Sequence, residues 1–256
     1  DRRQRQMCIR DRDNRLEFEI IGWGREHENW RIMRGIIPGR PDDESRAVWK
    51  ELDKLLERKF KRPDGKRMRI LTTFIDSGGH CKDAVYRECA MRTARRVFAI
   101  KGKGGDGIPF VTPPSKVPIK DNKRITCWLY TFGVDAGKEA IMSNIKVQEP
   151  GAKYCHFPRG ESYGYDSYYF NGLLSEKLEL TQTKRGNRWA WVKIPGHERN
   201  EALDCRNYAL GGFRILNPDM EAVERRLRNM PENPRPKKAA APQRRQNNAA
   251  QYFDEW

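Results

Sequence analysis

Residues 74–79 carry the clearest arrangement for chemistry in this chain of 256 residues, because Asp76 follows an apolar run and precedes a serine and two glycines. The apolar run at 68–75 is typical of a strand buried on both faces. A carboxylate at the carboxyl end of such a strand lies where α/β sheets bind ligands, and glycines let the backbone approach a ligand closely. Asp76 could instead cap the following helix at a tight turn.

Two further acids, Glu201 and Asp204, stand three residues apart in a segment with helical periodicity. At this spacing they share one face of a helix. Asp204 lies between two apolar residues on a helix that must pack, so its carboxylate needs a partner. An ordinary ion pair with Arg199 or Arg206 is the simpler alternative.

Taken together, the two segments predict one metal site. Carboxylates from a strand end and from a C-terminal helix can hold Mg²⁺ or Mn²⁺, which prefer oxygen ligands. Two such ions about 4 Å apart stabilise the attacking and leaving oxygens of phosphodiester hydrolysis. We expect Asp76 and Asp204 to be catalytic metal ligands, with Glu201 as a catalytic helper. The six cysteines and four histidines show no zinc-binding spacing, and no Walker A motif is present.

The net charge of +16 predicts a polyanionic partner, with double-stranded DNA as the first candidate. Lys101 and Lys103 stand in a glycine-rich segment at 101–107, where they could contact a DNA backbone. A solvated basic loop is the alternative. No run of 18 apolar residues occurs and the first fifteen residues lack an apolar core, so we expect neither a membrane span nor a signal peptide.

The elements that position these residues follow from hydrophobic periodicity. We expect strands at 16–23, 30–37, 68–75, 97–100, 125–132 and 188–194, and helices at 42–59, 80–92, 135–144, 170–181 and 200–216. The first two strands should pair as a hairpin. Residues 108–124 should be irregular, and a short amphipathic helix should follow Pro218. The tail after Met230 has the composition of a disordered segment.

Six motifs, in this order along the chain, resemble the nuclease domain of the lambda-type large terminase subunit of tailed phages. They read RLEFEIIGWG at 15–24, IDSGG at 75–79, IKG at 100–102, GVDAGK at 133–138, HFP at 156–158 and RNEALDC at 199–205. The last motif is followed by Tyr208 and Ala209, and it is the most specific of the six together with HFP. The resemblance covers roughly residues 15–216.

This resemblance implies an α/β fold with an RNase H-like mixed sheet flanked by helices, over residues 15–217. It also implies a metal-dependent endonuclease that cleaves concatemeric viral DNA during packaging, in the cytoplasm of the host cell. The implied partners are the small terminase subunit and the portal. The family's ATPase domain lies upstream, so we expect this chain to be a fragment. A catalytically degenerate RNase H-like module that binds DNA without cutting it remains an alternative, as does an integrase-like nuclease on the same fold.

The resemblance also places a third acid on the first strand, about five residues before the RLE stretch. That spacing falls on position 10, which is Arg10, and neighbouring Asp11 is the provisional catalytic and metal-binding stand-in. A shift of one residue in a strand reverses the side-chain direction. Residues 7–12 also resemble translated sequencing-adapter sequence, so residues 1–14 are set apart as a segment of uncertain, non-native origin.

Four basic residues are predicted to contact DNA. They are Lys101, Lys103, Lys138 and Arg199. Residues 218–256 are expected to form the short helix and a basic, disordered tail outside the nuclease domain.

Overall fold

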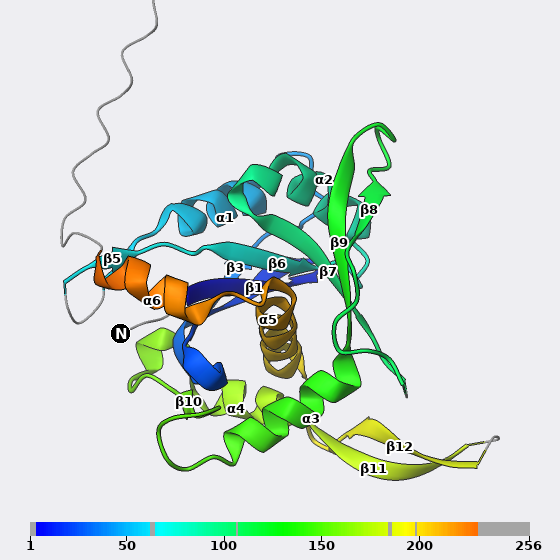
Figure 1. Cartoon of the computed structure of the whole chain (residues 1–256). Coiled ribbons are helices and arrows are strands. Elements are labelled where there is room, and N and C mark those ends of the chain that lie inside the picture. The colour runs from blue at the N-terminus through cyan, green and yellow to red at the C-terminus, as the bar shows by residue number, and fades with distance from the viewer. Residues whose placement is uncertain (1–3, 62–64, 106, 184–185, 198, 230–256) are drawn as a thin grey trace, which may run out of the picture.

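Two hydrogen-bonded strands at the start of the chain, β1 (Gln4–Arg12) and β2 (Arg15–Trp23), form the middle of the main sheet. The computed structural model describes residues 4–61, 65–105, 107–183, 186–197 and 199–229. Within these residues an eight-stranded sheet has the order β10-β3-β2-β1-β6-β7-β9-β8 (Figure 1). The β1–β2, β2–β3 and β8–β9 pairs are antiparallel, whereas the β1–β6, β6–β7, β7–β9 and β3–β10 pairs are parallel. This mixed sheet confirms the predicted RNase H-like α/β fold.

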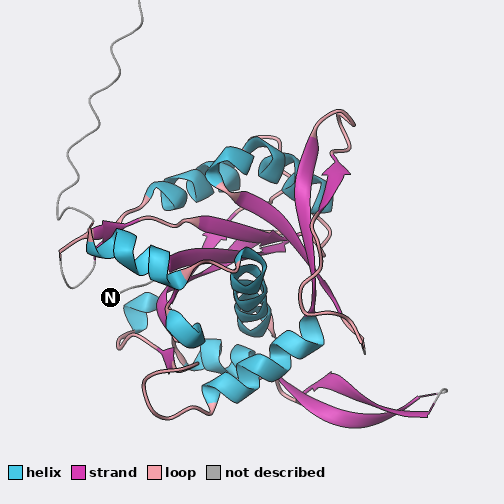
Figure 2. Cartoon of the chain, in the orientation of Figure 1, coloured by secondary structure: helices cyan, strands magenta, loops and turns pink. Residues whose placement is uncertain are grey.

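The remaining strands lie in the main sheet and in two small two-stranded sheets. Their bounds are β3 (Asn29–Pro38), β6 (Thr72–Asp76), β7 (Val97–Lys103), β8 (Ser115–Pro118), β9 (Thr126–Gly133) and β10 (Cys155–His156) in the main sheet, with β4 (Phe60–Lys61), β5 (Arg67–Met68), β11 (Glu176–Thr183) and β12 (Gly186–Lys193) in two separate hairpins. The β11–β12 hairpin extends away from the main sheet (Figure 2).

Helices cover both faces of the main sheet (Figure 1). They are α1 (Ala47–Glu57), α2 (Lys82–Met91), α3 (Val134–Ile145), α4 (Ser167–Leu173), α5 (Glu201–Leu216) and α6 (Met220–Arg228), with single turns η1 (Arg25–His27), η2 (Thr93–Arg95) and η3 (Glu161–Tyr163). Alternation along β1 divides the core. Met7 and Ile9 join the cluster that contains α1 and α2, and Cys8 joins the cluster of α4 and α5 on the other face. By the same alternation, the side chain of residue 10 lies on the face of the sheet that α5 covers.

The structure confirms most of the predicted elements and corrects five. Helix α1 begins at Ala47 rather than near residue 42, because Asp42 pairs with Arg40 and Asp43 accepts a hydrogen bond from the Ser45 amide in the preceding turn. The strand predicted at 68–75 is β6, which begins only at Thr72. Residues 108–124 contain the edge strand β8. The helix predicted at 170–181 is wrong, since α4 ends at Leu173 and the alternating residues beyond it form β11.

The fifth correction concerns the expected loop at 101–107. Lys101 and Lys103 lie in β7, which continues beside β9 through the pairs Lys101–Thr131 and Lys103–Gly133. Both side chains are exposed. The two lysines are therefore held on a strand rather than on a flexible loop.

The domain boundaries also differ from those expected. Because β1 is a central strand with Met7, Cys8 and Ile9 fully buried, the folded unit begins before residue 15. At the other end α6 packs on the domain through an ion pair of 2.8 Å between Arg25 and Glu224. The expected tail at 230–256 lies outside the described residues. Across the described ranges, no helix combines the length and hydropathy needed to cross a membrane.

Candidate active site

Asp76 and Asp204 lie together although 128 residues separate them in the chain. Asp76 is the last residue of β6, as predicted, and it is 2% exposed. Asp204 lies in the first turn of α5 and is 9% exposed. Asp76 does not cap α2, which begins six residues later; one of its oxygens, Oδ1, instead accepts a hydrogen bond of 2.9 Å from the Gly78 amide. The glycine thus fixes the carboxylate at the strand end.

One guanidinium bridges the two carboxylates. Arg10 Nη1 lies 2.5 Å from Asp204 Oδ2 and 3.3 Å from Asp76 Oδ2. The strand ladder explains this meeting, since the β1–β6 pairing runs to Ile9–Ile75 and both chains then continue by one residue, to Arg10 and Asp76. Asp204 therefore pairs with Arg10, which is distant in the sequence, and not with Arg199 or Arg206 as the simpler alternative predicted.

The bridge brings position 10 of β1 against the two carboxylates. Arg10 and Arg12 both reach acidic groups of α5, as expected for residues two apart in a strand. Asp11 lies between them in β1, and its side chain is outside the part of the chain that the structure describes. The spacing of the family motif thus agrees with the geometry, and the role given to Asp11 stays a prediction.

Burial dominates the electrostatics of Asp204. Loss of hydration raises the pKa of the Asp204 carboxyl to about 6, although the charges of Arg10 and Lys138 act to lower it. Tyr208, one turn further along α5, forms a side-chain hydrogen bond with Asp76, and burial raises the pKa of its hydroxyl well above the ordinary value. The hydroxyl of Tyr208 therefore stays protonated and can donate to Asp76.

Glu201, the predicted helper, is engaged by a different arginine. Its Oε1 lies 2.6 Å from Arg12 Nη2 and 4.0 Å from Arg15 Nη2. Burial opposes ionisation of Glu201, but its backbone hydrogen bond and the positive charge of Arg12 leave its pKa below the ordinary value. Glu201 is thus a paired carboxylate beside the Asp76–Asp204 pair.

A buried lysine–glutamate pair supports this end of α5. Lys138 Nζ in α3 lies 2.5 Å from Glu176 Oε2 at the start of β11, and the side chains are 10% and 6% exposed. Asn200 Nδ2 donates to Glu176 Oε1 at 2.9 Å. Lys138 was predicted to contact DNA, but its buried ion pair places it in the support of the site.

The other predicted DNA contacts are on the surface. Lys101 and Lys103 are exposed on β7, and Arg199 is exposed just before α5. The guanidinium of Arg199 donates to the hydroxyl of Tyr168 and lies 5.5 Å from the centre of the Tyr168 ring. These three positions remain open to a phosphate backbone.

Further along α5, Arg206 is fully buried and anchors the helix on the sheet. Its guanidinium lies 4.9 Å from the centre of the Trp23 ring. Burial, together with the charge of nearby Arg31, lowers the pKa of Arg206 to about 10.

Arg31 is itself buried and lies 3.2 Å from Glu19. Glu19 also accepts a hydrogen bond of 2.9 Å from the hydroxyl of Tyr169 in α4. The interior on this face of the sheet is therefore strongly polar.

The HFP motif has a structural explanation. The His156 ring stacks on Trp30 with 4.7 Å between ring centres, and its Nε2 lies 2.7 Å from Glu28 Oε1. Phe157 packs against Tyr169 and Phe170 of α4. These contacts hold the 156–158 segment between β3 and α4.

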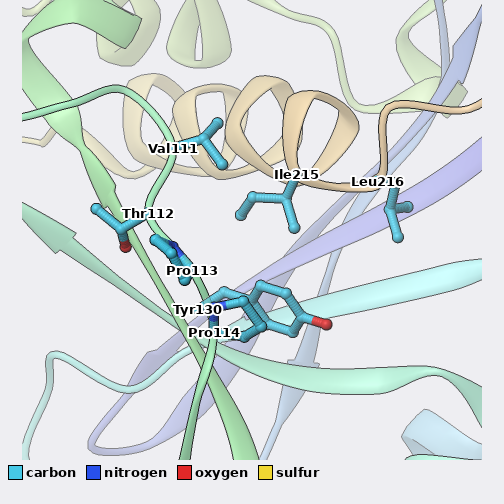
Figure 3. Close-up of a pocket in the computed structure, with 7 residues that line it drawn as sticks. All are labelled: Val111, Thr112, Pro113, Pro114, Tyr130, Ile215 and Leu216. Carbon is cyan, nitrogen blue, oxygen red and sulfur yellow. The ribbon is translucent and has the colours of Figure 1, made fainter.

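A pocket of about 470 Å³ lies beside the C-terminal end of α5 (Figure 3). It is lined by Val111, Thr112, Pro113, Pro114, Tyr130, Ile215 and Leu216. None of these residues is one of the carboxylates or arginines described above. The pocket therefore shares no lining residue with the acidic site.

The described side chains do not form the expected two-ion site. In the described part of the chain, no group of three or more histidine, cysteine, aspartate or glutamate side chains is placed to hold a metal. Asp76 and Asp204 offer the oxygen donors that Mg²⁺ prefers, but Arg10 already lies against both. With arginine at position 10, the residues do not fit a pair of divalent ions.

The sequence alone missed two elements of the site, namely the Arg10 bridge and the Lys138–Glu176 pair. The family spacing that falls on position 10 was the available signal for the first. No local signal could have found the second, because the pattern at 170–181 predicts a helix and the partners are 38 residues apart.

The structure thus combines a mixed RNase H-like sheet with acids at the end of a central strand and on a packed helix. Comparison with known proteins shows the family. The family model described as "Terminase large subunit gpA, endonuclease domain" matches residues 10–226. The chain belongs to this family.

Two curated relatives agree with the family match. The chain is 31% identical over 215 residues to the terminase large subunit of Escherichia phage lambda, and 28% identical over 207 residues to that of Enterobacteria phage P21. Each alignment covers 79% of this chain and 31% of the relative, so the chain spans about a third of their length. No solved structure matches.

Proposed function

We propose that this domain hydrolyses phosphodiester bonds of double-stranded DNA, with Asp76 and Asp204 as its catalytic carboxylates. The supporting observation is that these two acids, predicted independently from two distant segments, converge on a single guanidinium nitrogen. They do so in a chain that belongs to a family of endonuclease domains. Convergent acids at the end of a central strand suit phosphodiester chemistry better than a purely structural ion pair.

The finer features of the proposal follow from the family. The substrate proposed is concatemeric viral DNA, cleaved during genome packaging in the host cytoplasm. Mg²⁺ or Mn²⁺, with two ions, is the cofactor proposed for the family's reaction, and in this chain Arg10 occupies the place between the two carboxylates that such ions would need. The small terminase subunit and the portal are the proposed protein partners, and the net charge of +16 supports DNA as the polyanionic ligand.

One observation favours a second candidate function. Arg10 neutralises the carboxylates that the reaction would need, so the chain could act as a catalytically degenerate module that binds DNA without cutting it. Both candidates predict DNA affinity that falls steeply with salt, because lysine and arginine contacts to phosphates release counterions. Only the first predicts cleavage.

Nicking of a supercoiled plasmid in Mg²⁺ or Mn²⁺ separates the two candidates, with DNA affinity measured in parallel by fluorescence anisotropy. Cleavage by the parent chain that is lost in Asp76→Asn and in Asp204→Asn, with affinity retained, supports the nuclease. Salt-sensitive binding without any cleavage supports the binding module. If the two variants cut as well as the parent, the assigned carboxylates are wrong.

A further inference from the structure

We infer that the Arg10 guanidinium acts as the resident cation of the Asp76–Asp204 pair and thereby excludes divalent metal from the site of this chain. The inference depends on the proposed function only in taking these two aspartates as the metal-binding pair. It identifies the residue type at position 10 as the determinant of whether the site accepts a metal.

The first argument is distance. A Mg²⁺ ion bound by both carboxylates would lie about 2.1 Å from an oxygen of each. Arg10 Nη1 already lies within 3.3 Å of Asp76 Oδ2 and 2.5 Å from Asp204 Oδ2. A metal ion bridging the same two oxygens would be in contact with this nitrogen, so the two cations cannot occupy the site together.

The second argument is charge. Asp76 and Asp204 carry two negative charges, and the arginine, which does not deprotonate in proteins, supplies one positive charge to both. Their neighbouring charged groups are already paired: Glu201 with Arg12 at 2.6 Å, and Glu176 with Lys138 at 2.5 Å. No further described carboxylate completes a metal-binding group. The pair therefore lacks the negative charge that would draw in a divalent ion against the guanidinium.

The third argument is the rigidity of the bridge. Arg10 lies in a central strand, paired through its backbone with Glu17 of β2, two residues from the Cys8–Phe74 pair of β1 and β6. Its side chain is 21% exposed, and its buried Nε has no hydrogen-bond partner among the described residues. The strand thus directs the side chain at the carboxylates, and the two ion pairs hold it there.

The test is Mn²⁺ binding, measured by titration calorimetry and by the rise of the melting temperature with added Mn²⁺, on the full 256-residue chain without DNA. Arg10→Asp should bind Mn²⁺ more tightly than the parent, by about tenfold or more, the scale on which a ligand's close partners tune metal affinity. Because three buried carboxylates repel one another without a cation, Arg10→Asp should also melt at a lower temperature in EDTA and regain stability with Mn²⁺.

Arg10→Gln is the second variant, since it removes the positive charge without adding a carboxylate and keeps a polar side chain for folding. It should bind Mn²⁺ more tightly than the parent and more weakly than Arg10→Asp. Arg25→Gln is the control, because it likewise removes one arginine from a carboxylate, Glu224, that is not among the carboxylates beside Asp76 and Asp204. It should leave Mn²⁺ binding unchanged.

Two results would overturn the inference: a parent chain that binds Mn²⁺ as tightly as Arg10→Gln, or an Arg25→Gln variant that gains as much affinity as the Arg10 variants. These outcomes are distinct from failure of the proposed function. A chain that gains Mn²⁺ with Arg10→Asp but never cuts DNA would refute the nuclease and keep the inference. A parent chain that binds Mn²⁺ and cuts DNA would refute the inference and support the nuclease.

Discussion

Replacing Lys138 by methionine tests whether this residue supports the site or contacts DNA. The change removes the positive partner of Glu176, which stays buried with a 6% exposed side chain and one remaining hydrogen bond, from Asn200. Breaking a buried ion pair by deleting one partner costs about 3–5 kcal/mol, because an uncompensated charge is left in the interior. We expect Lys138→Met to lower the free energy of unfolding by about this amount.

The assay is urea unfolding followed by circular dichroism, with DNA affinity measured on the same preparations. The control is the double variant Lys138→Met/Glu176→Gln, in which the buried charge is gone and glutamine can still accept from Asn200. Its stability should return to within about 1 kcal/mol of the parent, since neutral replacement of a buried pair is often without cost. Because Lys138 is 8% exposed, DNA affinity should change in neither variant. A Lys138→Met variant of parental stability and weaker DNA binding would refute this reasoning and restore the residue as a DNA contact.

Three further predictions concern packing, DNA binding and pH. Gly212→Ala places a methyl group against the Phe74 ring where α5 crosses the sheet, and should cost about 1–3 kcal/mol in the free energy of unfolding, measured by urea titration; an unchanged midpoint would contradict the packing. Combined Lys101→Ala and Lys103→Ala should weaken DNA binding and reduce the slope of log affinity against log salt by up to about two, and an unaltered slope would exclude these lysines as phosphate contacts. Burial acts to raise the pKa of the Asp53 carboxyl, but Arg92, paired with it at 2.7 Å, lowers the pKa below the ordinary 3.8. The stabilisation from this ion pair should therefore be present above pH 3.8 and be lost as the pH falls below that value. Asp53→Asn should therefore destabilise the chain near neutral pH and lose its effect in acid, and an equal effect at both pH values would argue against the ion pair.

The sequence predicted the two aspartates because each depends on local pattern. Asp76 ends an apolar run before glycines, and Asp204 lies on a helix whose apolar face is visible from spacing alone. Each pattern by itself also fitted an ordinary cap or ion pair. What joins the two residues is the parallel register of β1 and β6 and the packing of α5, which no local pattern contains.

The elements that the sequence missed depend on long-range pairing. Strand β1 is rich in charged residues, so its periodicity is weak; Arg10 and Arg12 are accommodated in the sheet because both find carboxylates on or beside α5. Residues 176–183 alternate like a strand, but only pairing with β12 decides between strand and helix. A central strand with charged residues and a hairpin arm are thus cases where tertiary contacts override local preference.

The central claim is that Asp76, Asp204 and position 10 form one catalytic site. The most direct measurement compares plasmid nicking in Mn²⁺ by Arg10→Asp with nicking by the same chain carrying Asp204→Asn as well. The account predicts that Arg10→Asp cuts faster than the parent, that EDTA stops the cutting, and that Asp204→Asn reduces it to background. Equal cutting with and without Asp204 would contradict the claim.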